Sequence, residues 1–414
     1  TFMAIALSDV SNALQKVIMP FIQDNLPKQT ILLDQLKRNQ GVTFMNDYFY
    51  APIRTGRHGG VVNLANDSNS LLSGKSSIGQ ASVGVKILTG TFDISKLAID
   101  ATKSAKGAVE NQLTFQARTL ATDFARSINR QYYSDGVGVV SEFAGSAASA
   151  VYVRFPTASL DDVRSTFYGS INGDISPTKY LAAGQYIAVG TPEVKGTIVA
   201  VTGGTTLQVA AASIAGTAGQ AIYILDGSNE GAGTSEIQGV RAALSNSTGT
   251  STYAGVARST TGWTPQLGTA AETLTLSAIE QQYLAAREYS QMGDRFAIFM
   301  NKTLYKKYGD LLTALRRTVN ETELLGGWTG LEFAAGAGKV GVFLDYDVPD
   351  GEVLILDLDS FTVCQVSDMD WMEDPSGALI RRVDKITYQA TMVWFTNLIC
   401  LCPAANGRLV QKKG

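Results

Sequence analysis

One stripe of apolar residues constrains the fold of this chain more than any other feature of its sequence. Between residues 102 and 131, apolar side chains recur at spacings of three and four, and most charged side chains lie off the stripe. The stripe consists of Val109, Leu113, Ala117, Leu120, Phe124 and Ile128. The spacing predicts a single amphipathic helix of roughly 45 Å, which is longer than most helices of globular proteins. We expect one face of this long helix to pack against another layer of the molecule.

The residues before this helix predict a projecting β-hairpin. Strand-like alternation runs from 42 to 64 and again from 81 to 94, and the segment between them, 66–77, is mostly polar. Two long strands joined by a polar tip form a hairpin that is marginal by itself in water. We therefore expect this hairpin to need a partner surface.

Two further regions differ in composition from the rest of the chain. Residues 8–40 alternate short helical runs with breaks at Pro20 and Pro27, which predicts an arm of short helices laid over other elements. Residues 156–228 have few aromatic side chains, and short β-branched runs recur about every ten residues between glycine-rich turns. This second pattern predicts a small β barrel or sandwich, inserted between two pieces of another domain.

The remaining residues combine helices with strands. Helical spacing returns at 274–289 and 302–319, with a strand predicted between them at 295–300, and mainly strands follow residue 340. The fold class is therefore α+β. No apolar stretch reaches the roughly 18 residues that a membrane-spanning helix needs, so we expect no membrane partner.

The composition includes few of the residues that catalytic sites most often use. The 414 residues include one histidine, His58, although general bases and zinc ligands draw on histidine first. The three cysteines, Cys364, Cys400 and Cys402, predict buried side chains rather than a disulfide framework. A formal net charge of −3 disfavours a dedicated nucleic-acid-binding domain. We predict no enzyme, no cofactor and no metal site.

Two glycine-rich segments match nucleotide-binding patterns only in part. Gly336 to Gly341 reads G-x-G-x-x-G, but the strand-like residues 342–344 follow where a helix N-terminus must hold the pyrophosphate. Gly74-Lys75-Ser76 resembles the end of a phosphate loop, but Asn69 stands where the first glycine belongs. We interpret the first segment as a turn and the second as part of the hairpin tip.

Acidic pairs recur near the ends of the predicted strands. They are Asp345/Asp347, Asp357/Asp359, Asp368/Asp370 and Glu373/Asp374. Carboxylates two residues apart on a strand share a face, as a cation site or a glycosidic-bond-cleaving site requires. Asp is also favoured in turns because its side chain bonds to nearby backbone. We favour turn and solvent roles and keep a cation site as the alternative.

The order of these elements resembles the major capsid proteins of tailed bacteriophages with the Hong Kong 97 type of fold. The segment Tyr253 to Arg258, followed by Trp263, resembles their "Y-A-G-x-x-R … W" pattern. Residues 276–308 resemble a helix, strand and helix of that family, and residues 341–359 resemble its closing stretch. The resemblance leaves out the insertion.

The resemblance implies a division of the chain into five parts. They are an N-terminal arm at 1–46, an extended loop at 47–98, a peripheral domain with the long helix at 99–155 and 355–414, an inserted β domain at 156–228, and an axial domain at 229–354.

The resemblance also implies a function. The chain would be a structural subunit of an icosahedral viral capsid, assembling into hexamers and pentamers around packaged double-stranded DNA. Its partners would be copies of itself, a separate scaffolding protein and a portal, with a decoration protein as a further candidate. Residues 1–60 hold six Lys or Arg against four Asp, so contact with DNA would be weak and non-specific. The location would be the virion, after assembly in the host bacterial cytoplasm.

In such a shell the extended loop would lie across a neighbour's long helix. The candidate intersubunit contacts are Arg57, His58, Asn69, Lys75, Lys86, Arg118, Arg126, Arg258 and Trp263. For Arg258 and Trp263, a plain core pair is an equally open interpretation. Two other functions also stay open: an encapsulin-like compartment shell, and a surface protein that binds or cleaves polysaccharide.

Overall fold

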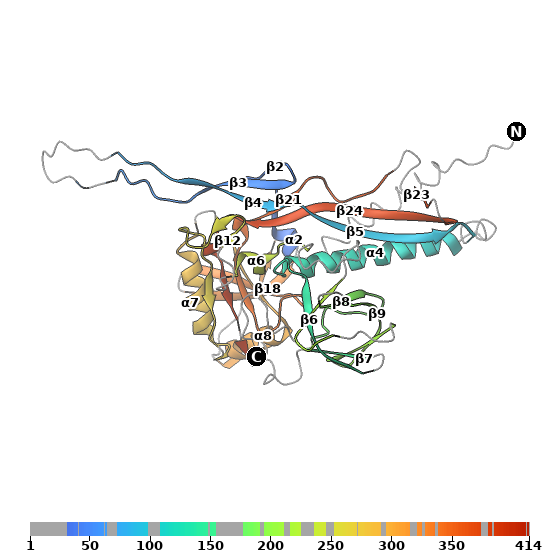
Figure 1. Ribbon diagram of the computed structural model, residues 1–414. Helices are drawn as coiled ribbons and strands as arrows, with labels where there is room; N and C mark the ends of the chain where they lie inside the picture. The colour runs from blue at the N-terminus through green and yellow to red at the C-terminus, as the bar shows by residue number, and fades with distance from the viewer. Residues whose placement is uncertain are drawn as a thin grey trace.

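The computed structural model places most of the chain in three parts: a long two-stranded ribbon with a helix beneath it, a seven-stranded sheet, and a closed barrel (Figure 1). The residues that it describes are 31–39, 41–61, 63, 73–97, 108–147, 150–154, 177–190, 194–210, 216–224, 236–245, 252–270, 272–290, 295–314, 321–324, 328–335, 338–373, 380–382, 385–410 and 412–413.

The ribbon consists of β5 (Lys86–Ser95) and β24 (Thr387–Cys400), which pair antiparallel over ten residues. Helix α4 (Ala108–Tyr132) runs beneath it, and the helix predicted at 102–131 is thus confirmed over its described part (Figure 1). Side chains along β5 alternate between half-buried and exposed, because only one face of the ribbon packs on α4. A Cβ atom at Gly90 would lie 3.0 Å from Leu120 Cδ1, so this glycine allows the helix to approach closely.

The other edge of β24 pairs with three shorter strands, β21 (Phe361–Gln365), β22 (Asp370–Trp371) and β23 (Ile380–Arg381). The 3-10 turn η1 (Leu358–Ser360) leads into β21. The described part of the arm lies here. Helix α2 (Ile31–Gln35) is followed by β1 (Lys37–Arg38), which adds parallel to β21. A short helix laid over other elements, as the sequence predicts, is confirmed for this segment.

The hairpin is a three-stranded sheet of β2 (Thr43–Met45), β3 (Tyr48–Arg54) and β4 (Ile78–Gly84), and it projects from one end of the ribbon (Figure 1). Asn46 and Asp47 join β2 to β3 with φ of 49° and 62°, a left-handed conformation that these residue types tolerate. The predicted second strand at 81–94 is divided between two sheets, because β4 pairs within the hairpin and β5 pairs with β24.

The seven-stranded sheet contains two strands that are buried along their whole length. Its order is β14 (Gln266–Gly268), β25 (Gly407–Leu409), β20 (Val353–Asp357), β16 (Phe296–Met300), β19 (Gly338–Leu344), β18 (Trp328–Ala335) and β17 (Glu321–Leu324). Every residue of β16 and β20 is buried. Helices α7 (Leu276–Arg287) and α8 (Lys302–Ala314) share a hydrophobic cluster with one face of these strands, and the other face joins the cluster beneath the ribbon.

The barrel closes in the order β10 (Thr206–Val209), β7 (Ala150–Arg154), β6 (Val139–Ala147), β11 (Ala221–Ile224), β8 (Tyr186–Val189) and β9 (Val194–Thr202). It therefore begins at Val139, ahead of the composition change at residue 156 from which the sequence places the insertion. The core of the barrel is a separate apolar cluster around Phe143, Ile187 and Leu207.

Short elements complete the fold. They are α6 (Val240–Ala243), the pair β12 (Thr252–Tyr253) and β13 (Val256–Ala257), the pair β15 (Glu272–Thr273) and β26 (Lys412–Lys413), and the 3-10 turn η2 (Pro403–Ala405). Within the described residues, no helix is both long and apolar enough to cross a membrane.

Candidate functional site

The outer face of the ribbon exposes apolar side chains that the helix beneath does not cover. Ile87 on β5 lies directly opposite Phe395 on β24, and their exposed fractions are 59% and 36%. Val366 is 46% exposed and its backbone N–H donates to Phe395 O at 3.1 Å, which places it beside the pair. These three residues, the outer-face group, form a candidate contact surface.

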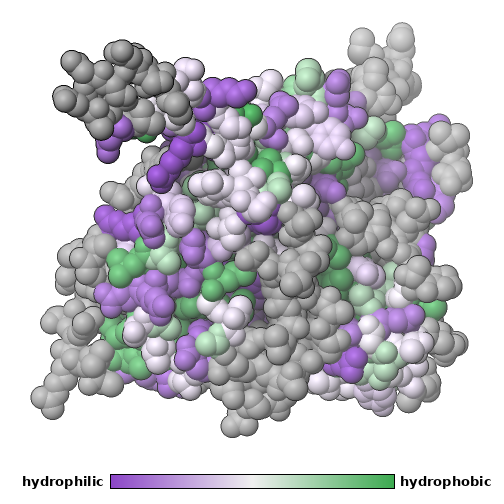
Figure 2. Space-filling view, turned by 60° about the vertical axis from the view of Figure 1, so that its left-hand side comes forward, coloured by the Kyte–Doolittle hydropathy of each residue, from purple (hydrophilic) through white to green (hydrophobic). Residues whose placement is uncertain are grey.

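The hairpin exposes a second set of apolar side chains. Phe44, Met45, Tyr48 and Ile78 are all exposed, while Phe49, whose ring centroid lies 5.2 Å from that of Phe44, joins the core. On the side of the molecule that Figure 2 shows, apolar residues are interspersed with hydrophilic ones. The hairpin is therefore a candidate contact surface because its exposed apolar side chains lie on a projecting element, and not because they are numerous.

The candidate contacts predicted on the hairpin and the helix lie largely in solvent. Arg57, His58 and Lys75 are exposed, and His58 Nδ1 accepts a bond from its own loop, from Gly60 N at 3.1 Å. Arg118 and Arg126 are exposed on α4. All five side chains are accessible to a partner.

Two other predicted contacts differ from these. Lys86 at the start of β5 is half-buried, and this burial lowers the pKa of its ammonium group. Asn69 lies outside the described residues.

Arg258 and Trp263 are buried inside the chain. Arg258 donates from Nη1 to Ala243 O at 2.7 Å and from Nη2 to Ala242 O at 2.8 Å, and its guanidinium lies 4.9 Å from the Tyr253 ring centroid. Trp263 Nε1 donates to Tyr253 O at 3.0 Å. Of the two interpretations left open by the sequence, these contacts fit a core pair: Arg258 holds the segment 252–264 against α6, and Trp263 bonds within that segment. A cation over an aromatic face adds to that attachment.

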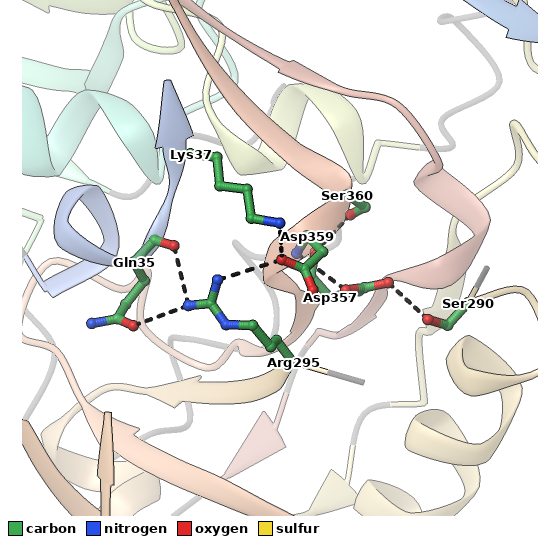
Figure 3. Close-up of polar contacts among 7 residues, drawn as sticks. All are labelled: Gln35, Lys37, Ser290, Arg295, Asp357, Asp359 and Ser360. Atoms are coloured by element: carbon green, nitrogen blue, oxygen red, sulfur yellow. Dashed lines mark hydrogen bonds and ion pairs between the residues drawn. The ribbon is translucent and has the colours of Figure 1, made fainter. Parts of the chain in front are cut away.

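The carboxylate of Asp359 joins the arm to the sheets (Figure 3). Its Oδ1 lies 2.8 Å from Lys37 Nζ and 3.4 Å from Arg295 Nη1. Arg295 Nη2 in turn lies 3.4 Å from the backbone and the side-chain oxygens of Gln35. One carboxylate thus connects β1, α2 and the strand that begins after Arg295, which are remote in sequence.

Asp357 in the same cluster has a local role. It is fully buried, and its two carboxylate oxygens accept from Ser290 Oγ at 2.8 Å and from Asp359 N at 3.2 Å. Its backbone oxygen accepts from Ser360 Oγ at 2.7 Å. These bonds cap the η1 turn, so Asp357 has the predicted turn role, whereas Asp359 forms ion pairs instead of a turn or solvent contact.

The pair Asp345/Asp347 lies where β19, α4 and the barrel meet. Asn129 Nδ2 donates to Asp345 Oδ1 at 3.2 Å and to Asp347 Oδ2 at 2.6 Å, and Tyr133 OH donates to Asp345 Oδ2 at 3.0 Å. Burial raises the pKa of the Asp345 carboxyl, and the nearby Asp347 carboxylate raises it further, against the opposing hydrogen bonds. This is a buried polar contact between the long helix and the seven-stranded sheet.

The barrel attaches to the same loop. Lys179 Nζ donates to Val348 O at 2.9 Å and to Asp350 Oδ1 at 3.1 Å, and Tyr180 OH donates to Asp347 O at 2.9 Å. The barrel is therefore fastened to the end of β19 by polar contacts, as well as by its covalent connection to α4.

The remaining sequence candidates for chemistry have structural roles in the described residues. Asp368 accepts from Gln365 Nε2 at 2.8 Å, and Asp370 accepts from the N–H of Trp371 at 2.7 Å. Among the described residues, no cluster of three His, Cys, Asp or Glu side chains is arranged to hold a metal ion. Gly338 begins strand β19 rather than a helix, which agrees with the rejection of a dinucleotide site. Asp374 lies outside the described residues.

Two of the three cysteines resemble buried apolar residues, whereas Cys402, also predicted to be buried, is half-buried. Cys364 and Cys400 are fully buried, and burial raises the pKa of the Cys364 thiol to about 12. A thiol with a raised pKa is a poor nucleophile, because the thiolate is the reactive form.

Sequence reasoning missed one buried ion pair. Glu352, which precedes β20, accepts from Arg408 Nε and Nη2 at 2.9 Å each, and both side chains are 1% exposed. The two residues are 56 positions apart, and no local pattern marks either of them as buried.

The fold was compared with those of known proteins. No protein-family model and no curated protein matches the chain. Among solved structures, the capsid asymmetric unit of Cyanophage A-1(L) matches with a TM-score of 0.53 and 14% identity, over 93% of each chain. The chain has the fold of a phage capsid protein.

Two further structures match less closely than the cyanophage capsid. The capsid of a native GTA particle matches with a TM-score of 0.45 and 12% identity, over 92% of this chain and 89% of the other. An encapsulin, SrpI from Synechococcus elongatus PCC 7942, matches with a TM-score of 0.45 and 7% identity, over 92% and 87%. At these identities, the likeness to a phage capsid protein concerns the fold.

Proposed function

We propose that the chain is a structural, non-enzymatic subunit of an icosahedral viral capsid. In this proposal it assembles into hexamers and pentamers that enclose packaged double-stranded DNA. The observation that carries the proposal is the likeness to the cyanophage capsid subunit over 93% of both chains. A projecting hairpin and a ribbon with an exposed apolar outer face support it, because both leave surface for a second molecule.

The proposed Hong Kong 97 type of organisation follows the sequence division. The arm is 1–46, the extended loop 47–98, the peripheral domain 99–155 with 355–414, and the axial domain 229–354. The inserted β domain is 156–228, and it uses β6 and β7 of the peripheral segment to close its barrel. A separate scaffolding protein and a portal are the proposed partners, and DNA contact is weak and non-specific.

The proposed contact between subunits places the hairpin of one copy across α4 of the next. The candidate contacts on the hairpin are Arg57, His58 and Lys75, and those on the helix are Arg118 and Arg126. Because four of the five are cations, each set would pair with acidic or carbonyl groups of the neighbour rather than with the other set. The exposed apolar residues of the hairpin, such as Ile78, supply the burial that a hairpin requires for stability.

Electron microscopy of the purified chain, alone and with a scaffolding protein, tests the proposal. We expect uniform closed shells, and nuclease-protected DNA in shells from infected cells. A chain that stays monomeric under both conditions contradicts the proposal. Shells that hold protein cargo and no DNA favour a compartment instead of a virus.

A matched pair of variants tests the contact. Ile78→Glu places a charge on an exposed apolar position of the hairpin, and Val199→Glu places the same charge on an exposed apolar position of the barrel. We expect the first to prevent shell formation without lowering the melting temperature, and the second to leave assembly unchanged. Normal shells from Ile78→Glu would contradict the assignment of the hairpin as a contact.

A further inference from the structure

At the end of β4, the hairpin joins the ribbon through a single residue. Strand β4 ends at Gly84 in the hairpin sheet, and β5 begins at Lys86 in the ribbon. Between them, Val85 N donates to Asp47 O at 2.9 Å. A connection of one residue does not by itself fix the angle between the two sheets. Hinges in proteins likewise consist of a few residues, so other contacts must set this angle.

Asn397 makes the first of these contacts. It lies fully buried in β24, and its Nδ2 donates to Gly84 O, the last residue of the hairpin, at 2.6 Å. Its Oδ1 accepts from Gln238 N, ahead of α6, at 3.0 Å. Because a buried amide must keep both its donor and its acceptor paired, one side chain fixes the end of the hairpin relative to two other segments.

The turn between β12 and β13 makes the second contact. Ala254 O at this turn accepts from Ser82 N in β4 at 2.8 Å. Ala254 and Gly255 have φ of 50° and 76°, and an alanine in this left-handed region is held there only by its surroundings. The holding residue is Tyr253, whose OH accepts from Cys400 N in β24 at 3.0 Å.

We infer that Asn397 and the Ala254 turn form a clasp that sets the direction in which the hairpin projects, with Val85 as the pivot. Both halves of the clasp connect to β24, so the strand that carries the ribbon also orients the hairpin (Figure 1). Asn397 is a positioning residue. The inference concerns a single chain and does not rest on the proposed function.

Spin-label distance measurement on the full chain tests the clasp. The labels are placed at Ile78→Cys on the hairpin and Arg126→Cys on α4, both exposed positions, with Cys402→Ser to remove a partly accessible thiol. Labelled chain is mixed with an excess of unlabelled chain, so that only distances within one chain contribute. We expect one narrow distance distribution.

Asn397→Asp then places a carboxylate oxygen against Gly84 O while it keeps the acceptor for Gln238 N. We expect the distance distribution to broaden or shift. The matched control is Thr396→Val, at the residue that precedes Asn397 in β24. It removes the hydrogen bond from Thr396 Oγ1 to Cys364 O at 2.9 Å and changes no contact with the hairpin. We expect the control to keep the narrow distribution even if its melting temperature falls. Equal broadening in both variants, or none in Asn397→Asp, overturns the inference.

Ser82→Pro is the second variant, and it keeps the test decisive if Asn397→Asp does not fold. Ser82 is half-buried on the hairpin, and proline removes the N–H that donates to Ala254 O. We expect the same broadening. A distribution as narrow as that of the unsubstituted chain overturns the role of the turn.

Discussion

The seven-stranded sheet and the ribbon bury their side chains in opposite ways. In β16 and β20 every residue is buried, with helices against one face and the cluster beneath the ribbon against the other. In β5 every second residue is exposed. Strands β16 and β20 are therefore covered on both faces within one chain, whereas the ribbon and the hairpin expose apolar side chains. The same polypeptide holds a fully buried region and a region with exposed apolar surface.

The largest expected effect comes from exchanging one phenylalanine in each region for alanine. Phe299 in β16 is fully buried, and Phe299→Ala is expected to lower the free energy of unfolding by about 3–5 kcal/mol. Phe395 in β24 is 36% exposed, and Phe395→Ala is expected to lower it by less than about 1 kcal/mol while shell assembly weakens. Urea unfolding measures the first quantity and light scattering the second. Equal losses of stability would remove the distinction between the two regions.

The next largest effect is expected when a buried ion pair and an exposed ion pair are each broken. Glu352→Gln leaves Arg408 buried without its counter-charge in the seven-stranded sheet, and we expect a loss of about 3 kcal/mol in the free energy of unfolding. Asp368→Asn removes the partner of Arg38 in an exposed pair beside the ribbon, and we expect a loss under about 1 kcal/mol. Urea unfolding of both variants checks the difference. A small loss for Glu352→Gln would mean that water reaches the buried pair.

A smaller effect is expected where the ribbon meets its helix. Gly90→Val adds methyl groups at a place where even a Cβ atom would lie 3.0 Å from Leu120 and 3.1 Å from Phe124. Because α4 must shift to make room, we expect a loss of about 1–2 kcal/mol by thermal or urea unfolding. The control is Thr91→Val on the opposite, exposed face, which should change stability little. A harmless Gly90→Val would show that the helix is not closely seated on the ribbon.

The smallest effect concerns pH. The pKa of Asp345 is raised in the fold, so the native state binds this proton more tightly than the unfolded chain does. Its contribution to stability is therefore present below the ordinary carboxyl pKa of about 4 and is lost as the pH rises through the folded value. Asp345→Asn should reduce that loss when unfolding free energies are compared between pH 4 and pH 8. Asp123→Asn, at an exposed position of α4, serves as the control, and an identical pH profile for both variants would contradict the expectation.

The elements with strong local patterns were predictable from the sequence. The apolar stripe around Phe124 became α4, and the apolar run at 296–300 became β16, because each pattern has one way to bury its side chains. Aspartates at strand ends, such as Asp357, cap turns as their residue type suggests. The order of these elements was enough to indicate a capsid fold.

The contacts that join those elements were not predictable. Asn397 binds Gly84 across 313 positions, and Asn129 binds Asp345 across 216. No local pattern identifies a partner so far away in the sequence. For a related reason, the sequence did not show that β6 and β7 take part in the barrel. A change in composition can indicate where a domain lies. It cannot indicate the long-range pairing of β6 with β11 that closes the barrel.

The position of β25 has a consequence for how the protein is made. This strand lies between β14 and β20, so residues 407–409 complete a sheet whose other strands are synthesised earlier. Until residues 407–409 leave the ribosome, β20 has an unpaired edge, and β5 has an unpaired edge until β24 follows. The seven-stranded sheet and the ribbon therefore cannot complete their pairing while the chain is synthesised only as far as residue 386.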